Sequence, residues 1–173
     1  MSIDAILGDL TLEPADALVN AANSTLLGGG GVDGALHAAA GPGLLAACRR
    51  VRRTTWPDGL PVGEAVATEA GELPARWVIH TVGPNRNRGQ SEEGLLASCY
   101  TRSLDIAQEL GARTIAFPAV GAGAYGWDAA TAARVAVAAV AGHPRIGIGR
   151  VRFVLLNQPL LSAFGAEIDS LTA

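Results

Sequence analysis

Two glycine-rich segments are the first feature of the sequence that could do chemistry. The first is Gly28-Gly29-Gly30-Gly31, and the second runs from Gly121 to Gly126. Glycines let backbone N–H groups converge on an anion without interference from a Cβ, and the N-terminus of a following helix adds donors and the positive end of its dipole. One such loop is more often a plain tight connection, but two of them favour a diphosphate ligand.

The second segment, Gly121 to Gly126, also matches the pattern G-x-G-x-x-G of dinucleotide-binding proteins. That motif requires an acidic residue roughly 20 positions onward, at the end of the next strand, to bind a ribose hydroxyl. Here the next predicted strand ends in Leu155-Leu156-Asn157-Gln158, and no acidic residue occurs between Asp128 and Glu167. Nicotinamide-dependent hydride transfer is therefore a poor fit, whereas a nucleotide diphosphate remains a good one.

Three polar residues surround the first glycine-rich segment. Asn23 precedes it, Asp33 follows it at the mouth of a predicted helix, and His37 lies one helical turn after Asp33. An asparagine in a turn and an acidic residue in the first turn of a helix also have ordinary structural roles, and a single histidine is more often a packed or surface residue than a catalyst. The alternative is that Asn23 and Asp33 together contact one part of a ligand.

Other candidates carry less weight. His80 lies within an apolar strand, which favours a buried, hydrogen-bonded histidine without a catalytic role. Tyr125 lies in the second glycine-rich segment and Trp127 directly follows it, so either ring could stack on a sugar or a base. The run Arg49–Arg53 ends a predicted helix, where cations complement the helix dipole; a solvated helix end is favoured there over a nucleic-acid patch.

The elements that must position these residues alternate between strand-like and helix-like runs, which is typical of an α/β sheet with helices on its faces. The predicted strands are Ile3–Leu7, Ala17–Ala21, Glu64–Ala70, Trp77–Thr81, Thr114–Phe117 and Val151–Leu156. The predicted helices are Val32–Ala40, Gly43–Arg53, Glu92–Leu110, Asp128–Ala141 and Pro159–Ser170.

Composition limits the class of protein. The 173 residues, 49% of them hydrophobic, are enough for one domain with a substantial core, and we expect a single domain over residues 1–173. The longest apolar run, Val135–Ala141, is far shorter than the roughly 18 to 20 residues that cross a membrane. The net charge of −3 argues against generic nucleic-acid binding, and the absence of lysine excludes Schiff-base chemistry and a lysine-bearing phosphate loop.

The two cysteines predict neither a metal site nor an exported protein. Cys48 and Cys99 have no second cysteine or histidine at metal-ligand spacing, so we expect packing thiols and no metal ion. The chain shows no export signal, which leads us to expect a reducing cytoplasm.

At these same residues the sequence resembles the macrodomain family, and within it the MacroD-type bacterial ADP-ribosyl hydrolases. Together the similar stretches cover most of the chain from Gly8 to about Ala139, and the run from Asn20 to Gly41 is highly specific. They are GDLT at 8–11, ADALVNAANSTLLGGGGVDGALHAAAGPGLLAAC at 15–48, PVGEAVATEAGELPARWVIHTVGP at 61–84 and AFPAVGAGAYGW at 116–127.

The resemblance implies a three-layer α/β/α macrodomain with a central mixed sheet of about six strands, which binds ADP-ribose at the strand ends. It implies that Asp9 holds the adenine amino group with help from the backbone of Leu10. It assigns the distal ribose and hydrolysis to Asn23 and Asp33, and a supporting position to His37. The loops that it assigns to the diphosphate and distal ribose are Gly30, Gly31, Val32 and Asp33 in one, and Gly121, Ala122, Gly123, Ala124 and Tyr125 in the other.

The activity implied is hydrolytic removal of ADP-ribose from mono-ADP-ribosylated acidic side chains of proteins, or deacetylation of O-acetyl-ADP-ribose, with no cofactor, metal ion or membrane. Both substrates are esters at the distal ribose, so both need a positioned water and stabilised charge at the ester carbon. A non-catalytic module that binds ADP-ribose is an alternative. A hydrolase of ADP-ribosylated nucleic-acid ends, or a nucleic-acid regulator, is a third, with support only from Arg49–Arg53.

The sequence also departs from the family at several positions. Gly121 and Ala122 replace residues that commonly carry a hydroxyl, so the diphosphate loses side-chain contacts but keeps backbone donors. Leu156 and Asn157 replace a common aromatic-acidic ending of the last strand, which removes a stacking partner for adenine. Trp127 and Asp128 replace a more usual Tyr-Pro, and Asp128 is expected to cap the following helix.

Overall fold

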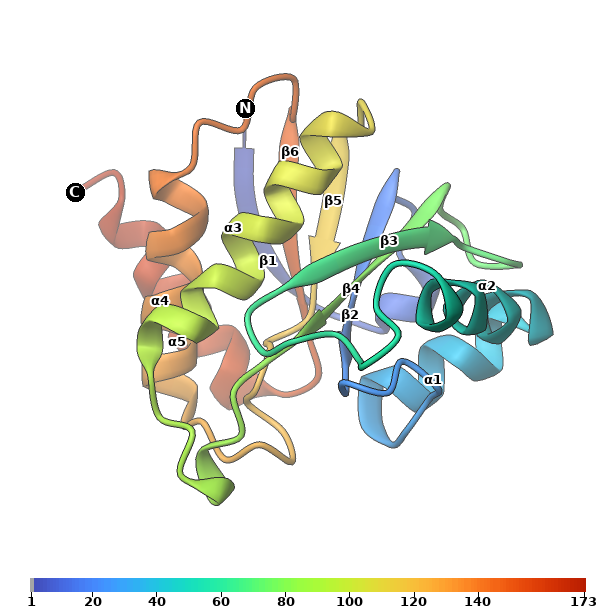
Figure 1. The fold of residues 1–173 in the computed structure, drawn as a ribbon. Helices are drawn as coiled ribbons and strands as arrows, with labels where there is room; N and C mark the ends of the chain where they lie inside the picture. Colours follow the sequence, from blue (N-terminus) through green and yellow to red (C-terminus); the bar gives the residue numbers. More distant parts are fainter. Residues whose placement is uncertain (1) are drawn as a thin grey trace.

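The structure, a computed structural model, describes residues 2–173 and consists of a six-stranded mixed sheet between two layers of helices (Figure 1). The strands are β1 (Ser2–Leu7), β2 (Ala17–Ala22), β3 (Ala65–Glu69), β4 (Trp77–Val82), β5 (Thr114–Phe117) and β6 (Arg150–Leu155). The helices are α1 (Gly31–Ala40), α2 (Pro42–Arg53), α3 (Glu93–Glu109), α4 (Ala129–Gly142) and α5 (Gln158–Ser170), with short 3-10 helices η1 (Leu10–Leu12) and η2 (Arg86–Arg88).

The sheet has the order β1-β6-β5-β2-β4-β3. Every neighbouring pair is parallel except β3 and β4, which are antiparallel. The connection that leaves β2 runs toward the β3 edge, whereas the one that leaves β5 runs toward the β1 edge. In open α/β sheets ligands bind outside the carboxyl ends of the strands at such a reversal, which here lies between β2 and β5.

Strand β2 shows how the sequence places its side chains on the two faces. Ala17 and Val19 point into the core beneath α3, α4 and α5, whereas Leu18 points into a second core beneath α1 and α2. This alternation is the two-residue period of a strand, and both faces are apolar because both are covered by helices. The same two layers of helices lie on opposite sides of the sheet in Figure 1.

The larger core is organised around four aromatic rings. Tyr100, Phe117 and Phe153 contact one another with ring centroids 5.1 to 6.2 Å apart, and Phe164 of α5 lies 4.9 Å from Phe153. These tilted contacts are a favourable geometry for aromatic pairs. They hold β5 and β6 against the helical layer and thereby fix the strand ends that border the site.

The predicted strands and helices are all present, and the fold class is confirmed. Most of their ends lie one residue from the predicted position. For example, α1 begins at Gly31 and α2 at Pro42, each one residue earlier than predicted. Asp128 caps α4 as expected, because its carboxylate accepts from Thr131 N at 2.9 Å. The two 3-10 helices were not predicted. Among the described residues no helix combines the length and the apolar character needed to cross a membrane.

Candidate functional site

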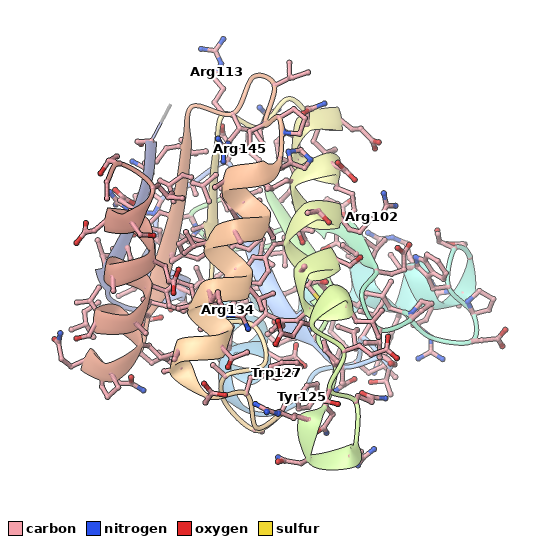
Figure 2. All side chains as sticks on the ribbon, turned by 90° about the vertical axis from the view of Figure 1, so that its left-hand side faces the viewer. Arg102, Arg113, Tyr125, Trp127, Arg134 and Arg145 are labelled. Carbon is pink, nitrogen blue, oxygen red and sulfur yellow. The ribbon has the colours of Figure 1, made fainter. Side chains whose placement is uncertain are left out.

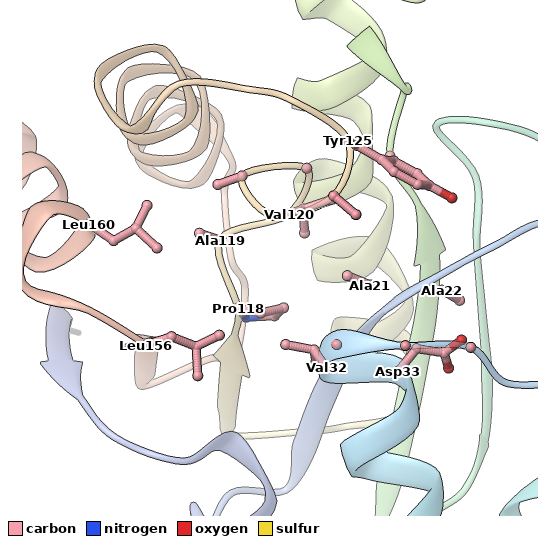
Figure 3. Close-up of a pocket in the computed structure, with 18 of the residues that line it drawn as sticks. Ala21, Ala22, Val32, Asp33, Pro118, Ala119, Val120, Tyr125, Leu156 and Leu160 are labelled. Atoms are coloured by element: carbon pink, nitrogen blue, oxygen red, sulfur yellow. The ribbon is translucent and has the colours of Figure 1, made fainter. Parts of the chain in front are cut away.

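A cavity of about 370 Å³ lies at the carboxyl ends of β2, β5 and β6, where the strand order reverses. Figure 3 shows Leu156 and Leu160 at one side of it and Asp33 and Tyr125 at the other. The lining comes from the end of β2, the start of α1, the segment after β5 and the end of β6. Its residues are Ala21, Ala22, Asn23, Gly29, Gly30, Gly31, Val32, Asp33, Gly83, Pro118, Ala119, Val120, Gly121, Ala122, Gly123, Ala124, Tyr125, Val154, Leu155, Leu156, Asn157 and Leu160.

The first glycine-rich segment leads directly into α1 and forms one wall of the cavity. Gly30 caps the helix and Gly31 is its first residue, and neither Cα has another part of the protein packed against it on the side where a Cβ would be. The first backbone N–H groups of a helix have no partner within the helix. An anion at this wall would meet those donors and the positive end of the dipole, as the sequence predicts.

Asp33 lies in the first turn of α1 and is 4% exposed. Its Oδ1 accepts a hydrogen bond of 2.8 Å from Asn20 Nδ2. His37 Nε2 is 3.4 Å from the same oxygen, an ion-pair distance that lacks hydrogen-bond geometry. Asp33 Oδ2 has no hydrogen-bond partner in residues 2–173. A buried carboxylate oxygen without a partner is costly, so a hydrogen bond from a ligand hydroxyl or a water to Asp33 Oδ2 would be favourable.

Asn23 is held in place by its own loop. Its Oδ1 accepts from Thr25 N at 3.0 Å and from Thr25 Oγ1 at 2.5 Å, and its Nδ2 donates to Gly28 O at 3.1 Å. One N–H of the amide remains for a ligand. A Cβ on Gly29 would lie 3.1 Å from Asn23 Nδ2 and 3.1 Å from Asp33 Oδ2, so the structure brings the two predicted residues together in the lining of the cavity.

The second glycine-rich loop is fixed by a neighbouring segment, residues 84–88, which we call the brace. Arg86 N donates to Tyr125 O at 2.8 Å, and Asn87 Nδ2 donates to Ala124 O at 2.9 Å. Pro84 O accepts from Trp127 Nε1 at 2.9 Å. The loop has no serine or threonine side chain, but these contacts order its backbone.

Trp127 belongs to this support and not to the cavity. Its side chain is 4% exposed, and the guanidinium of Arg86 lies 5.2 Å from its ring while bonding to Asp128 at 2.9 Å. The expectation that Trp127 could stack on a ligand is therefore wrong, because the brace covers its ring. Tyr125 does line the cavity, and Figure 2 shows both residues beside the brace at one end of the molecule.

Three residues assigned by resemblance lie outside the cavity lining. Asp9 is exposed and caps η1, with Oδ1 accepting from Thr11 N at 2.9 Å, while Leu10 is buried in the core beneath α1. Both follow β1, whose neighbour β6 ends at the leucine side of the cavity. His37 lies behind Asp33 on the next turn of α1.

Asn20 contacts Asp33 from within the sheet, and the sequence analysis gave it no role. It is fully buried on β2 and donates both to Asp33 and to His80 Nδ1, the latter at 3.1 Å. The available signal was a polar amide within an apolar strand, which must find a buried partner. His80 is a buried, hydrogen-bonded histidine as expected, and burial together with the charge of His37 lowers its pKa to about 3.

Two arginines of the run at the end of α2 make contacts within the protein. Arg50 pairs with Glu69 at 3.0 Å, and Arg52 donates to the backbone carbonyls of Thr25, Trp56 and Pro57.

Cys48 and Cys99 are both buried free thiols, and burial raises the pKa of each to about 11. Within residues 2–173 no group of three or more His, Cys, Asp or Glu side chains could hold a metal ion.

Comparison with known proteins identifies the family of this chain. Residues 19–136 match the Macro domain family model. A Macro domain-containing protein of Streptomyces coelicolor is 54% identical over 166 residues, which cover 96% of this chain and 98% of that protein. An O-acetyl-ADP-ribose deacetylase of Escherichia fergusonii is 53% identical over 139 residues, which cover 80% of this chain and 77% of the relative.

Solved structures of macrodomains have the same fold as this chain. The macrodomain of Oceanobacillus iheyensis with ADP superposes with a TM-score of 0.92 at 38% identity, covering 97% of this chain and 90% of that one. The Trypanosoma brucei macrodomain in complex with ADP-ribose gives a TM-score of 0.81 at 33% identity, covering 98% of this chain and 68% of the other.

Proposed function

Because the chain belongs to the Macro domain family, we propose that it is a hydrolase of ADP-ribose esters that binds ADP-ribose in the cavity at the ends of β2, β5 and β6. Its substrates are mono-ADP-ribosylated acidic side chains, O-acetyl-ADP-ribose, or both. The names of relatives at about 50% identity support a deacetylase activity. The observation that carries the proposal is the buried, unpartnered Asp33 Oδ2 beside the amide of Asn23.

The cavity suits each part of ADP-ribose. Its aliphatic side, with Leu156 and Leu160, offers an apolar surface for adenine without an aromatic stacking partner. Asp9, which follows β1 outside the lining, would accept from the adenine amino group. The N-terminus of α1 and the loop from Gly121 to Tyr125 offer backbone N–H groups to the diphosphate. The distal ribose then lies between Asn23 and Asp33.

The reaction needs no more than these groups and water. Asp33 Oδ2 accepts a hydrogen bond from a water, which attacks the ester carbon. The bond between that carbon and the ribose oxygen breaks, the ribose oxygen takes one proton of the water, and the other proton leaves to solvent. The products are ADP-ribose and a free carboxylate, either acetate or the side chain of the target. A diphosphate oxygen of the substrate assists Asp33, while Asn23 fixes the ribose.

The test is release of ADP-ribose from a protein modified on glutamate or aspartate, and of acetate from O-acetyl-ADP-ribose. Asp33→Asn should lower turnover by about 10² to 10⁴, and Asn23→Ala should lower it by at least about tenfold. Calorimetry should still detect ADP-ribose binding to both variants. Asp169→Asn, an exposed residue near the end of α5, is the matched control and should behave as wild type.

A non-catalytic binding module is the second candidate, favoured by the extent to which the cavity is built from backbone rather than from reactive side chains. If the wild-type protein binds ADP-ribose but releases nothing from either substrate, this candidate replaces the hydrolase.

A further inference from the structure

A chain of hydrogen bonds runs from the site into the sheet, away from the cavity. It starts at Asp33 on α1, crosses β2 at Asn20 and β4 at His80, and reaches Thr68 on β3, whose Oγ1 is 3.0 Å from His80 Nε2. Asn20 and His80 are directly opposite each other in the register of β2 and β4. All four residues are buried, and the hydrolysis described above gives His80 and Thr68 no role.

The chemistry of the groups sets the direction of every bond. A carboxylate only accepts, so the Asn20 atom that faces Asp33 must be the amide nitrogen, which then also donates to His80 Nδ1. Since His80 Nδ1 accepts, the ring proton lies on Nε2 and is donated to Thr68 Oγ1. The Thr68 hydroxyl donates in turn to Glu69 O at 3.0 Å.

This order requires a neutral His80. A protonated ring would carry a hydrogen on Nδ1, opposite the N–H of Asn20, so two donors would face each other. The titratable groups around the ring are Asp33 and His37 on α1 and Cys48 on α2, whose Sγ is 3.6 Å from Nε2. Full burial keeps the ring neutral through the physiological range.

We propose that His80 is a positioning residue for hydrolysis: with its tautomer set by Thr68, it orients the Asn20 amide, which pins Asp33 Oδ1 and leaves Oδ2 facing the substrate. This inference rests on the proposed function. A carboxylate with one oxygen fixed keeps its second oxygen in a single position, and placement of the attacking group is a large part of what a site contributes to rate.

The experiment changes Thr68, which does not line the cavity. Thr68→Val keeps the shape of the side chain but removes the acceptor for Nε2–H, so the Nε2–H tautomer loses stabilisation and the alternative, with the proton on Nδ1, becomes more populated. We expect kcat on the ADP-ribosyl ester to fall about fivefold to tenfold, with the Kd for ADP-ribose within about twofold of wild type and an unchanged binding stoichiometry. Thr68→Ser restores the hydroxyl and should restore kcat.

Nitrogen-15 NMR of the His80 ring provides a readout that a purely structural role would not change. The wild type should carry the proton on Nε2, and Thr68→Val should move a measurable fraction to Nδ1. A wild-type ring protonated on Nδ1 overturns the inference, as does a Thr68→Val protein with wild-type kcat. If the wild type hydrolyses neither ester, the proposed function fails instead, and the tautomer in wild type and variant still decides how His80 orients Asn20.

Discussion

At the scale of a single residue, Gly29 shows how little space separates the side chains of Asn23 and Asp33 from the backbone beside them. A Cβ at this position would lie 3.1 Å from Asn23 Nδ2 and 3.1 Å from Asp33 Oδ2. The backbone of Gly29 does not have a positive φ, so the reason for glycine is space alone. The glycine therefore keeps open the space beside Asn23 and Asp33 that the proposed substrate would enter.

Gly29→Ala should consequently impair turnover without unfolding the protein. A methyl group there displaces both side chains by a few tenths of an ångström and occupies the space between them, so we expect kcat/KM to fall between about tenfold and a hundredfold. Steady-state kinetics on the ADP-ribosyl ester measure this. Gly94→Ala, in α3 with open space around it, is the control. Wild-type kinetics for Gly29→Ala would show that the space beside Gly29 is not used.

At the scale of elements, the brace explains how a loop made mostly of small residues keeps a fixed backbone. Gly121 has a φ of +80°, and a Cβ there would be 2.7 Å from the Trp127 ring, so the loop closes tightly on its support. The brace then fixes the outer side of the loop at Ala124 and Tyr125. A loop held in its binding conformation loses less conformational entropy when a ligand arrives.

Removing one contact of the brace should weaken binding more than catalysis. Asn87→Ala deletes the hydrogen bond to Ala124 O, and we expect the Kd for ADP-ribose to rise about threefold to tenfold while kcat at saturation changes less than about twofold. Calorimetry and kinetics on one sample separate the two quantities.

Arg88→Ala is the matched control, because Arg88 lies on the same 3-10 helix and its hydrogen bond to Asn85 is made by its backbone. An equal effect of both variants would mean that the Asn87 side chain does not order the loop.

At the scale of the whole molecule, burying an uncharged histidine makes stability depend on pH. The pKa of His80 falls from 6.5 to about 3 in the folded protein, first because of burial and then because of the charge of His37. Between these two pKa values the unfolded chain binds a proton at this residue that the folded protein does not. The contribution that neutral His80 makes to the free energy of unfolding is therefore complete above about pH 6.5 and is lost as the pH falls toward 3.

Urea unfolding between pH 4.5 and 6 tests this expectation. The free energy of unfolding of wild type should fall by up to about 1.4 kcal/mol per pH unit more steeply than that of His80→Gln, which has no group to titrate there. The comparison of slopes remains valid if the variant is less stable at every pH. Parallel slopes would mean that His80 is already protonated in the folded protein.

Local patterns in the sequence determined a large part of this protein. The alternation of apolar runs predicted every strand and helix, because the periods of 2 and 3.6 residues are set by the backbone. The glycine-rich segments, with Asn23 and Asp33 beside them, predicted an anion site at the strand ends, and the cavity lies there. Asp128 was a readable helix cap because its partner, Thr131, is three residues away.

Only the tertiary structure decided which polar groups meet. The bond between Asn20 and His80 joins residues 60 positions apart, and that between Asn87 and Ala124 joins residues 37 apart. Such contacts depend on the order and register of the strands, which put β2 beside β4, and on how loops from different strands pack together. Local periodicity carries no information on either, so the burial of Trp127 beneath the brace and the chain from Asp33 to Thr68 follow from the folded structure alone.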